Sequence, residues 1–562
     1  MEAQEKAVGT EGMEVDERRF YKVYDYKTHT AIFFKNLPHT EALALLDVSS
    51  SSRISPKPGD MLRDRLMQKS DDMFSGLYPD TSISVGEALE NEPEALEKNV
   101  RASLYRIKEN LGSRNISEQS HAMIALVTPI HNVMLMQMEM FNASQERSTR
   151  YVKFEEMYVP QFLPKSGGSE EKSERAMRAY VETLSKICDT HNKAFDIISL
   201  KYVAKFEQEN GRQPTESELR DKIYPSVRDY TRALLPTATK TIVFFSDSER
   251  TFESMTKKLY ATGNPTNIEV ADLLAHVCRE NMPSLSAHMN ADQFDKEIAK
   301  MTRKVVSIDE AHEWHWLNTN FMINWSGTTA EARLIGEASQ TEGQMLATIA
   351  YWISGRDMNY YGGPENDKRA LEYLSISQNR EGKWDEFTDS ALAATKVSFE
   401  IKVDIGTMRD LIRHRLATKT HFITQNEYIL PKLISEDADA MPIIKDAFEH
   451  VSESTKLLNE LGYGEEAKLL MPMATKATLK MTMSLAEAIF IIEQRSTKEA
   501  HWEYKQIALQ MFDELKKNYP EIMKGLKLFV GDNRFQPESQ KNYTEYSRSL
   551  RSHADEVSKI LN

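Results

Sequence analysis

A short segment occurs twice in this chain, and the repeat constrains the fold more than any other sequence feature. Residues 235–240 read LPTATK and residues 471–476 read MPMATK. Each copy precedes a predicted long helix, a break and a second helix that carries a glutamate. Glu269 follows its proline by 33 residues (269 − 236), and Glu503 follows its proline by 31 (503 − 472). Because a repeat in one chain marks repeated structural units, the sequence predicts two diverged copies of one module.

The length of 562 residues agrees with two modules, since one hydrophobic core rarely serves so long a chain. We expect a disordered acidic tail at residues 1–18, a first domain at 19–305, a second at 310–535 and a helical tail at 536–562. A net charge of −14 argues against a general nucleic-acid or membrane-surface binder, which needs a basic face.

Local patterns predict both strands and helices. Aromatic and β-branched residues in 20–34 and 313–325 indicate strands. Apolar spacing indicates helices at 38–47, 93–110 and 329–339, and a helix at 116–141 that Pro129 should kink. Mostly helical segments are expected from residue 174 onward, and again in the second half to about residue 530.

Two cysteines, Cys188 and Cys278, are too few for a disulfide scaffold and suit a reducing compartment. No apolar run approaches the roughly 20 residues that span a bilayer, and the first residues lack the apolar core of a signal peptide. We therefore expect a cytoplasmic protein with no membrane or nucleic-acid partner. The sequence shows no convincing metal-ligand cluster.

Three groups of residues then point to a family. The second copy contains Arg413-His414-Arg415 and, later, Arg495 ahead of Ala500-His501-Trp502-Glu503. The first copy contains QERSTRY at residues 145–151. Together with the repeated L-P-x-A-T segment, these resemble the motifs of flavin-dependent thymidylate synthases. The resemblance implies an α+β fold in two tandem copies of a thymidylate synthase-complementing-type module, a mixed sheet flanked by long helices.

The long signature of that family, R-H-R-x-x-S-x-N-E-x-S-x-R-Y, is divided between the copies. The first copy keeps Glu146, Ser148 and Arg150, whereas its R-H-R positions read MEM at 138–140. The second copy keeps R-H-R, but an ungapped alignment places four other residues on the N-E-S-R positions: Thr420, His421, Ile423 and Gln425. A shifted alignment would instead use Asn426 and Glu427.

At other positions of the family pattern, one copy likewise keeps the family residue and the other copy has a different residue. Arg232 stands four residues before the proline of the first copy, where the second has Lys468, and Arg495 of the second copy corresponds to Leu259. Near the expected flavin, the first copy keeps only parts of two motifs, represented by Glu118 and Arg250.

The resemblance implies conversion of dUMP to dTMP, with FAD as cofactor and methylenetetrahydrofolate and NADPH as co-substrates. Glu146, Ser148, Arg150 and Arg232 would bind the nucleotide, because a phosphate needs fixed cationic donors. Arg495 would stabilise negative charge that develops on the pyrimidine carbonyls. Arg413 would contact substrate and cofactor, and the cofactor set would be Arg413, His414, Arg415, Glu118 and Arg250.

Since each copy keeps what the other lacks, we expect one composite site that draws on both copies. The family is tetrameric, so a homodimer of this two-copy chain would match it. The alternative is a catalytically inactive nucleotide-binding or scaffold descendant, which the incomplete flavin motifs favour. In that case Arg413, His414 and Arg415 would form a solvated basic helix end.

Overall fold

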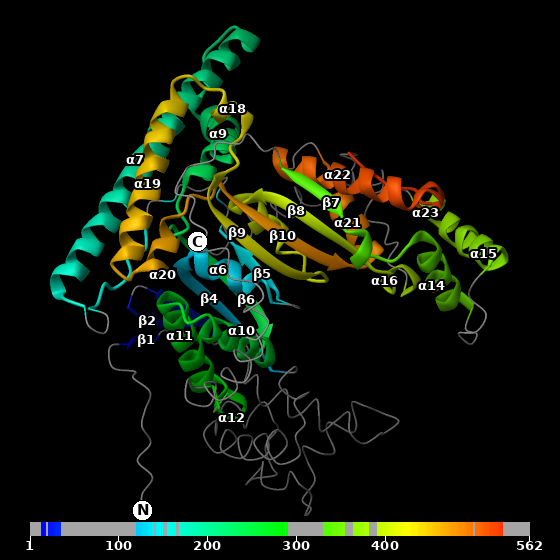
Figure 1. The fold of residues 1–562 in the computed structure, drawn as a ribbon, viewed down its shortest axis with the longest axis horizontal. Helices are drawn as coiled ribbons and strands as arrows, with labels where there is room; N and C mark the ends of the chain where they lie inside the picture. The colour runs from blue at the N-terminus through cyan, green and yellow to red at the C-terminus, as the bar shows by residue number, and fades with distance from the viewer. Residues whose placement is uncertain are drawn as a thin grey trace, which may run out of the picture. The chain divides into compact units, whose positions relative to one another are not determined.

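The computed structural model describes a part of the chain that excludes most of both ends and two long internal stretches. Two compact units emerge from its backbone contacts: Met1–Ile323 with Glu436–Met473, and Asn324–Ser435 with Ala474–Asn562 (Figure 1). The described residues are 13–17, 21–27, 29–34, 120–139, 142–147, 149, 154, 156–164, 168–286, 288–289, 330–354, 363–380, 390–497 and 501–531.

The first unit contains a six-stranded sheet in the order β1-β2-β3-β4-β6-β5. Burial alternates along β6, as expected for a strand with one face on the core. The strands are β1 (Met13–Glu17), β2 (Tyr21–Tyr26), β3 (His29–Phe34), β4 (His121–Pro129), β5 (Ser144–Glu146) and β6 (Lys240–Ser248).

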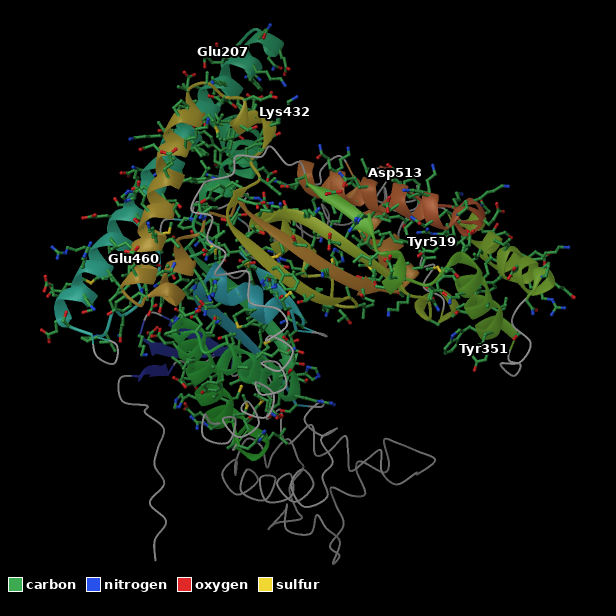
Figure 2. All side chains as sticks on the ribbon, viewed as in Figure 1. Glu207, Tyr351, Lys432, Glu460, Asp513 and Tyr519 are labelled. Atoms are coloured by element: carbon green, nitrogen blue, oxygen red, sulfur yellow. The ribbon has the colours of Figure 1, made fainter. Side chains whose placement is uncertain are left out.

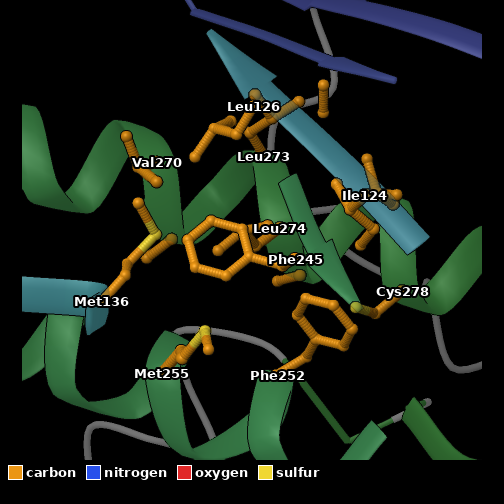
Figure 3. Close-up of a cluster of buried hydrophobic side chains, with 14 of the residues drawn as sticks. Ile124, Leu126, Met136, Phe245, Phe252, Met255, Val270, Leu273, Leu274 and Cys278 are labelled. Carbon is orange, nitrogen blue, oxygen red and sulfur yellow. The ribbon is translucent and has the colours of Figure 1, made fainter. Parts of the chain in front are cut away.

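Three helices cover one face of this sheet: α6 (Ile130–Gln137), α10 (Glu249–Ala261) and α11 (Pro265–Asn281). Figure 3 shows Phe245 of β6 and Ile124 of β4 packed with Phe252 of α10 and Leu274 of α11, and all four are fully buried. Burial of this apolar surface is the main source of the unit's stability. A short helix, α12 (Pro283–Ser286), follows.

A second group of helices in this unit is built around α7 (Glu170–Asn210). The Ser169 side chain caps its first turn and Gly211, with φ of 67°, ends it in the left-handed conformation that glycine tolerates. The other members are α8 (Glu216–Glu218), the π-turn η2 (Leu219–Ile223), α9 (Tyr224–Thr231), η3 (Arg232–Leu234), α19 (Ala440–Glu460), α20 (Gly464–Ala467) and η8 (Lys468–Leu470).

The helices α7 and α19 pack antiparallel, and in Figure 2 Glu207 lies near the opposite end of the pair from Glu460. Their contact is apolar at Leu184 and Leu458, and Thr183 Oγ1 donates to Ser454 Oγ at 2.7 Å. Residues 436–473 therefore belong to the first unit, although they lie far along the chain.

The second unit contains a four-stranded sheet in the order β7-β8-β10-β9. Its strands are β7 (Glu331–Leu334), β8 (Val397–Asp404), β9 (Thr418–Tyr428) and β10 (Thr475–Met483). The helices are η5 (Gly336–Ala338), α14 (Glu342–Ser354), α15 (Pro364–Leu374), η7 (Ser375–Asn379), α16 (Ser390–Ala393), α17 (Ile405–Leu411), α18 (Lys432–Ser435), α21 (Leu485–Arg495), α22 (Trp502–Asn518) and α23 (Pro520–Gly525).

The two sheets share their strand order and their register. The series β3-β4-β6-β5 of the first unit corresponds to β7-β8-β10-β9 of the second. Lys240 pairs with Pro129, and Lys476, the last residue of the second repeat, pairs with Asp404. The helix after each long strand is capped by a serine, Ser248 or Ser484. The similarity is thus one of topology as well as sequence.

Within the first unit, the two L-P-x-A-T-like segments also pair with each other. Pro236 and Pro472 form an antiparallel bridge. Thr237 N donates to Met471 O and Met473 N donates to Leu235 O, both at 2.8 Å. The two bonds join equivalent positions of the repeat, so the exchange has approximate twofold symmetry.

The α+β class is confirmed, but several expected elements were wrong. All strand pairs described are antiparallel, so these sheets are not mixed. Part of the helix expected at 116–141 is β4, and Pro129 marks the change to α6. Each L-P-x-A-T segment leads into a strand rather than a helix, and the helix expected at 329–339 contains β7. Short apolar runs fit either structure, which explains these errors.

The expected boundaries also differ from the structure. Residues 13–17, placed in a disordered tail at 1–18, form a strand paired with β2. The domains expected at 19–305 and 310–535 do not match the compact units, because residues 436–473 pack with the first. The helices expected at 38–47 and 93–110, the strand at 313–325 and the tail at 536–562 lie outside the described residues.

We predict that Leu458→Ala destabilises the first unit by about 2–5 kcal/mol, because a fully buried leucine in the α7–α19 contact is lost. Hydrogen exchange should show faster opening of α7, with β8 and β10 retaining their protection. The exposed Glu453→Ala change on the same helix is the control. Faster exchange in β8 and β10 alone would contradict the assignment of residues 436–473.

Candidate functional site

Strand register decides between the two alignments of the divided motif. In the first unit Gln145 pairs with Phe244 and Glu146 with Val243. At the equivalent positions of the second unit, Thr420 pairs with Lys480 and His421 with Leu479. This agrees with the ungapped alignment. Asn426 and Glu427, which the shifted alignment would use, lie beyond an irregularity in the pairing of β9 with β10.

A cavity in the first unit is lined in part by Thr149. The volume of the cavity is about 50 Å³. Arg232, whose side chain is only 8% exposed, forms part of its wall. Arg232 Nη1 lies 3.5 Å from Thr149 Oγ1, and Thr149 stands between the motif residues Ser148 and Arg150. The lining residues are Thr149, Phe154, His191, Asn192, Phe195, Arg228, Arg232 and Leu235.

The remaining motif residues of the first copy are only partly described. Glu146 ends β5, is 3% exposed and accepts from Gln137 Nε2 at 3.4 Å. Ser148, Arg150 and Glu118 lie outside the described residues. The structure thus places Arg232 next to Thr149.

The position equivalent to Arg232 has a different environment. Lys468 opens η8 as Arg232 opens η3, but its ammonium group pairs with Glu465. Asn264 Nδ2 donates to the same carboxylate at 2.9 Å. A neutralising carboxylate disfavours a bound phosphate at Lys468.

In the second unit, the motif residues His414 and Arg495 lie close together, although they are 81 positions apart in the sequence. Arg495 Nε lies 3.5 Å from His414 Nε2. The same ring nitrogen lies 3.0 Å from Tyr504 Oη, while Nδ1 lies 3.3 Å from Glu487 Oε1. The Arg495 guanidinium sits over the Tyr504 ring at 4.7 Å. His414 therefore connects the R-H-R segment to the helix that carries Arg495.

Burial dominates the electrostatics of this cluster. Burial lowers the pKa of His414, and the nearby Arg495 acts in the same direction, while Glu487 opposes them. Burial also raises the pKa of Tyr504. A neutral imidazole between a tyrosine and an arginine can hold the guanidinium in place without competing for an anion.

The R-H-R residues do not all face the same way. Arg415 is exposed, and Arg413 is half-buried with Nη1 at 3.7 Å from Asp410 Oδ1. His414 is 5% exposed and both of its ring nitrogens have partners within the unit. His414 therefore contacts Tyr504, Glu487 and Arg495 of its own unit.

The end of α21 that carries Arg495 is held from both sides by contacts that sequence reasoning missed. Arg380 forms a buried bidentate pair with Glu493 at 2.9 and 2.8 Å. Phe529 N donates to the same carboxylate at 2.9 Å, and Gly531 N donates to Ser496 Oγ at 2.8 Å. No local pattern could reveal Arg380, because it is 113 residues from its partner.

The two glutamates that helped to define the repeat are not equivalent. Glu503 lies in the first turn of α22 and accepts from Thr407 Oγ1 at 2.8 Å. Glu269 lies one turn deeper in α11, where it accepts from Tyr158 Oη at 2.8 Å and contacts His29 at 3.2 Å. The two glutamates therefore occupy different turns of their helices, although they lie at similar distances from the repeated proline.

Arg250, expected near the flavin, is exposed in the first turn of α10.

A cluster of possible metal ligands, which sequence reasoning missed, lies in the first unit. Its ligand atoms lie within 4.8 Å of one another and come from Glu249, Glu253 and His288. Lys257 Nζ already contacts Glu253 Oε1 at 2.6 Å, so we do not assign a cation there. Among the described helices, none is long and apolar enough to cross a membrane.

We predict that Arg380→Met destabilises the second unit by about 3–5 kcal/mol, because it leaves the buried Glu493 carboxylate without its cation. Urea unfolding measures the loss. Arg369→Met removes an exposed pair with Glu365 and should cost about 0.5 kcal/mol or less. Equal effects of the two changes would contradict the proposed importance of the buried pair.

Protonation of His414 should destabilise the fold in mild acid. Its pKa is lowered in the folded state, so the unfolded chain binds more protons and stability falls as pH drops below the unfolded value of 6.5. We expect His414→Gln to lose less stability than the wild type between about pH 7 and about pH 5. His29 is also buried, and burial lowers its pKa as well. We therefore expect His29→Gln to lose less stability than the wild type over the same pH range. Identical pH profiles for wild type and His414→Gln would contradict this.

Comparisons with known proteins give one family match. Residues 357–521 match the family described as thymidylate synthase complementing protein. A flavin-dependent thymidylate synthase of Pyrococcus furiosus is 27% identical over 184 residues, 30% of this chain and 72% of that protein.

Longer matches carry no functional name. The UPF0159 protein Ta1429 of Thermoplasma acidophilum is 23% identical over 413 residues, 68% of this chain and 79% of that protein. A UPF0159 protein of Chlamydia muridarum is 22% identical over 527 residues, 88% of this chain and 90% of that protein. This chain is therefore similar to the named synthases over part of its length and to the UPF0159 proteins over most of it.

Proposed function

Because residues 357–521 fall within the thymidylate synthase complementing protein family, we propose that this chain is a flavin-dependent thymidylate synthase-like enzyme that methylates dUMP to dTMP. The observation that carries the proposal is the meeting of His414 and Arg495, two motif residues from distant segments, in one buried cluster.

The proposal includes a tandem duplication. Matching strand order, matching register and matched serine caps support two copies of one module. The symmetric exchange of backbone hydrogen bonds at Pro236 and Pro472 supports it further. Diverged copies explain why motif residues are divided between the two halves of the chain.

The first copy would supply the phosphate end of the nucleotide site. Arg232 is buried at a cavity, beside the segment of Ser148 and Arg150. Guanidinium groups bind phosphate oxygens through paired, charge-assisted hydrogen bonds, which lysine cannot reproduce. The replacement of Arg232 by Lys468 in the second copy, with Glu465 as its partner, supports use of one copy only.

The second copy would supply the group that stabilises charge on the base. Arg495 is half-buried, and His414 and the ring of Tyr504 restrict its guanidinium. Transfer of carbon or hydride to a pyrimidine ring places negative charge on its carbonyl oxygens. A pre-positioned cation lowers the energy of that state with little reorganisation. In this proposal His414 positions Arg495 and does not itself contact the nucleotide.

The residues that would hold a flavin are a reduced set. The exposed Arg415 and the half-buried Arg413 suit a pyrophosphate, whereas the buried His414 does not. A bound FAD would supply the hydride chemistry, with NADPH and methylenetetrahydrofolate as the proposed sources of electrons and carbon. The two arginines would bind and orient that cofactor.

The divided motifs predict one dUMP site for each chain, since neither copy keeps a full set. Titration of the full-length protein with dUMP, followed by calorimetry, should give one equivalent per chain. We expect Arg232→Ala and Arg495→Ala each to abolish conversion of dUMP, and Arg232→Ala to weaken dUMP binding more strongly. Two equivalent sites per chain would rule out the division of labour. A homodimer, checked by light scattering, would match the family tetramer.

The alternative is a catalytically inactive descendant that binds a nucleotide or acts as a scaffold. The burial of His414, whose ring nitrogens both have partners within its unit, favours this alternative. The absorption spectrum of the purified protein separates the two. Visible flavin bands, or their appearance after FAD is added, agree with the enzyme. A colourless protein that does not bind FAD but binds dUMP would establish the alternative.

A further inference from the structure

The long helix α7 contributes a wall to the cavity beside Arg232. His191, Asn192 and Phe195 line the cavity from α7, and Arg228 lines it from α9. The corresponding helix of the second copy, α19, ends after 21 residues, whereas α7 continues for 41. The extra length of α7 therefore belongs to the copy that carries Arg232.

Arg228 has the environment of an anion-binding residue. It is half-buried, and its guanidinium carbon lies 5.7 Å from the Phe195 ring centre and 5.9 Å from that of Tyr224. Burial lowers its pKa, and in the described part of the chain no carboxylate contributes to that shift. A partly desolvated guanidinium held between rings retains its capacity to bind an anion.

Arg228 and Arg232 reach the same cavity because α9 continues into η3 and the two residues are four positions apart. The cavity also has the rings of Phe154 and Phe195 in its wall. Two guanidinium groups beside aromatic rings suit a ligand that combines an anionic group with a planar ring. The volume of about 50 Å³ holds only a few waters, so the cavity would receive part of such a ligand and leave the rest outside.

We propose that Arg228 is a second phosphate-binding arginine of the nucleotide site, acting beside Arg232 in the same cavity. The ligand class is a pyrimidine nucleoside monophosphate, so this inference rests on the proposed function.

Binding of dUMP and of inorganic phosphate to the full-length protein tests the role of Arg228. Arg228→Gln should weaken both ligands by about 10- to 100-fold, the usual effect of losing a charge-assisted hydrogen bond. Arg228→Lys should be intermediate, because the charge remains and the fork is lost. Arg220→Gln, an exposed arginine of the adjacent η2 that pairs with Asp221, should leave both affinities unchanged.

The outcomes separate this inference from the function on which it rests. If the wild type binds no pyrimidine nucleotide, the proposed function itself fails. If Arg232→Ala weakens dUMP but Arg228→Gln and Arg228→Lys do not, the nucleotide site stands and the role of Arg228 is overturned. Circular dichroism shows whether each variant is folded. If Arg228→Gln is unfolded, the intermediate affinity expected of Arg228→Lys decides the question.

Discussion

Antiparallel register is the constraint on which the rest of both units depends. Each central strand, β6 or β10, lies between the long strand β4 or β8 and the strand that follows the R-H-R positions. Side chains alternate between the two faces of a strand. A slip of one residue would therefore move Glu146 to the other face of its sheet, and would do the same to His421 in the second unit. The same register fixes the turn that leads into β6, and with it the place of Arg232.

Buried polar contacts then fix the charged side chains. Arg495 is restricted by His414 and by the ring of Tyr504, while Arg380 and Glu493 hold the end of the helix that carries it. Burial of charge is unfavourable unless each group has a partner, so these contacts permit very few alternative arrangements.

The outcome at particular residues shows how far sequence reasoning reached. Arg413, Arg495 and Arg232 were each predicted from motifs, and the α+β class was predicted correctly. The strands β8 and β10 were missed, because short apolar runs satisfy a strand or a buried helix equally well. Arg380 and Arg228 were missed since neither belongs to a motif, and their importance comes only from what surrounds them.

The sequence by itself determined the repeat and the division of motif residues between its copies, because residue identity and spacing can be read along one chain. Only the tertiary structure decided that residues 436–473 pack against α7, that His414 is buried beside Arg495, and that Arg228 shares a cavity with Arg232. Burial and pairing join residues that are far apart in sequence, and hydrophobic burial is not directional enough for local patterns to specify those partners.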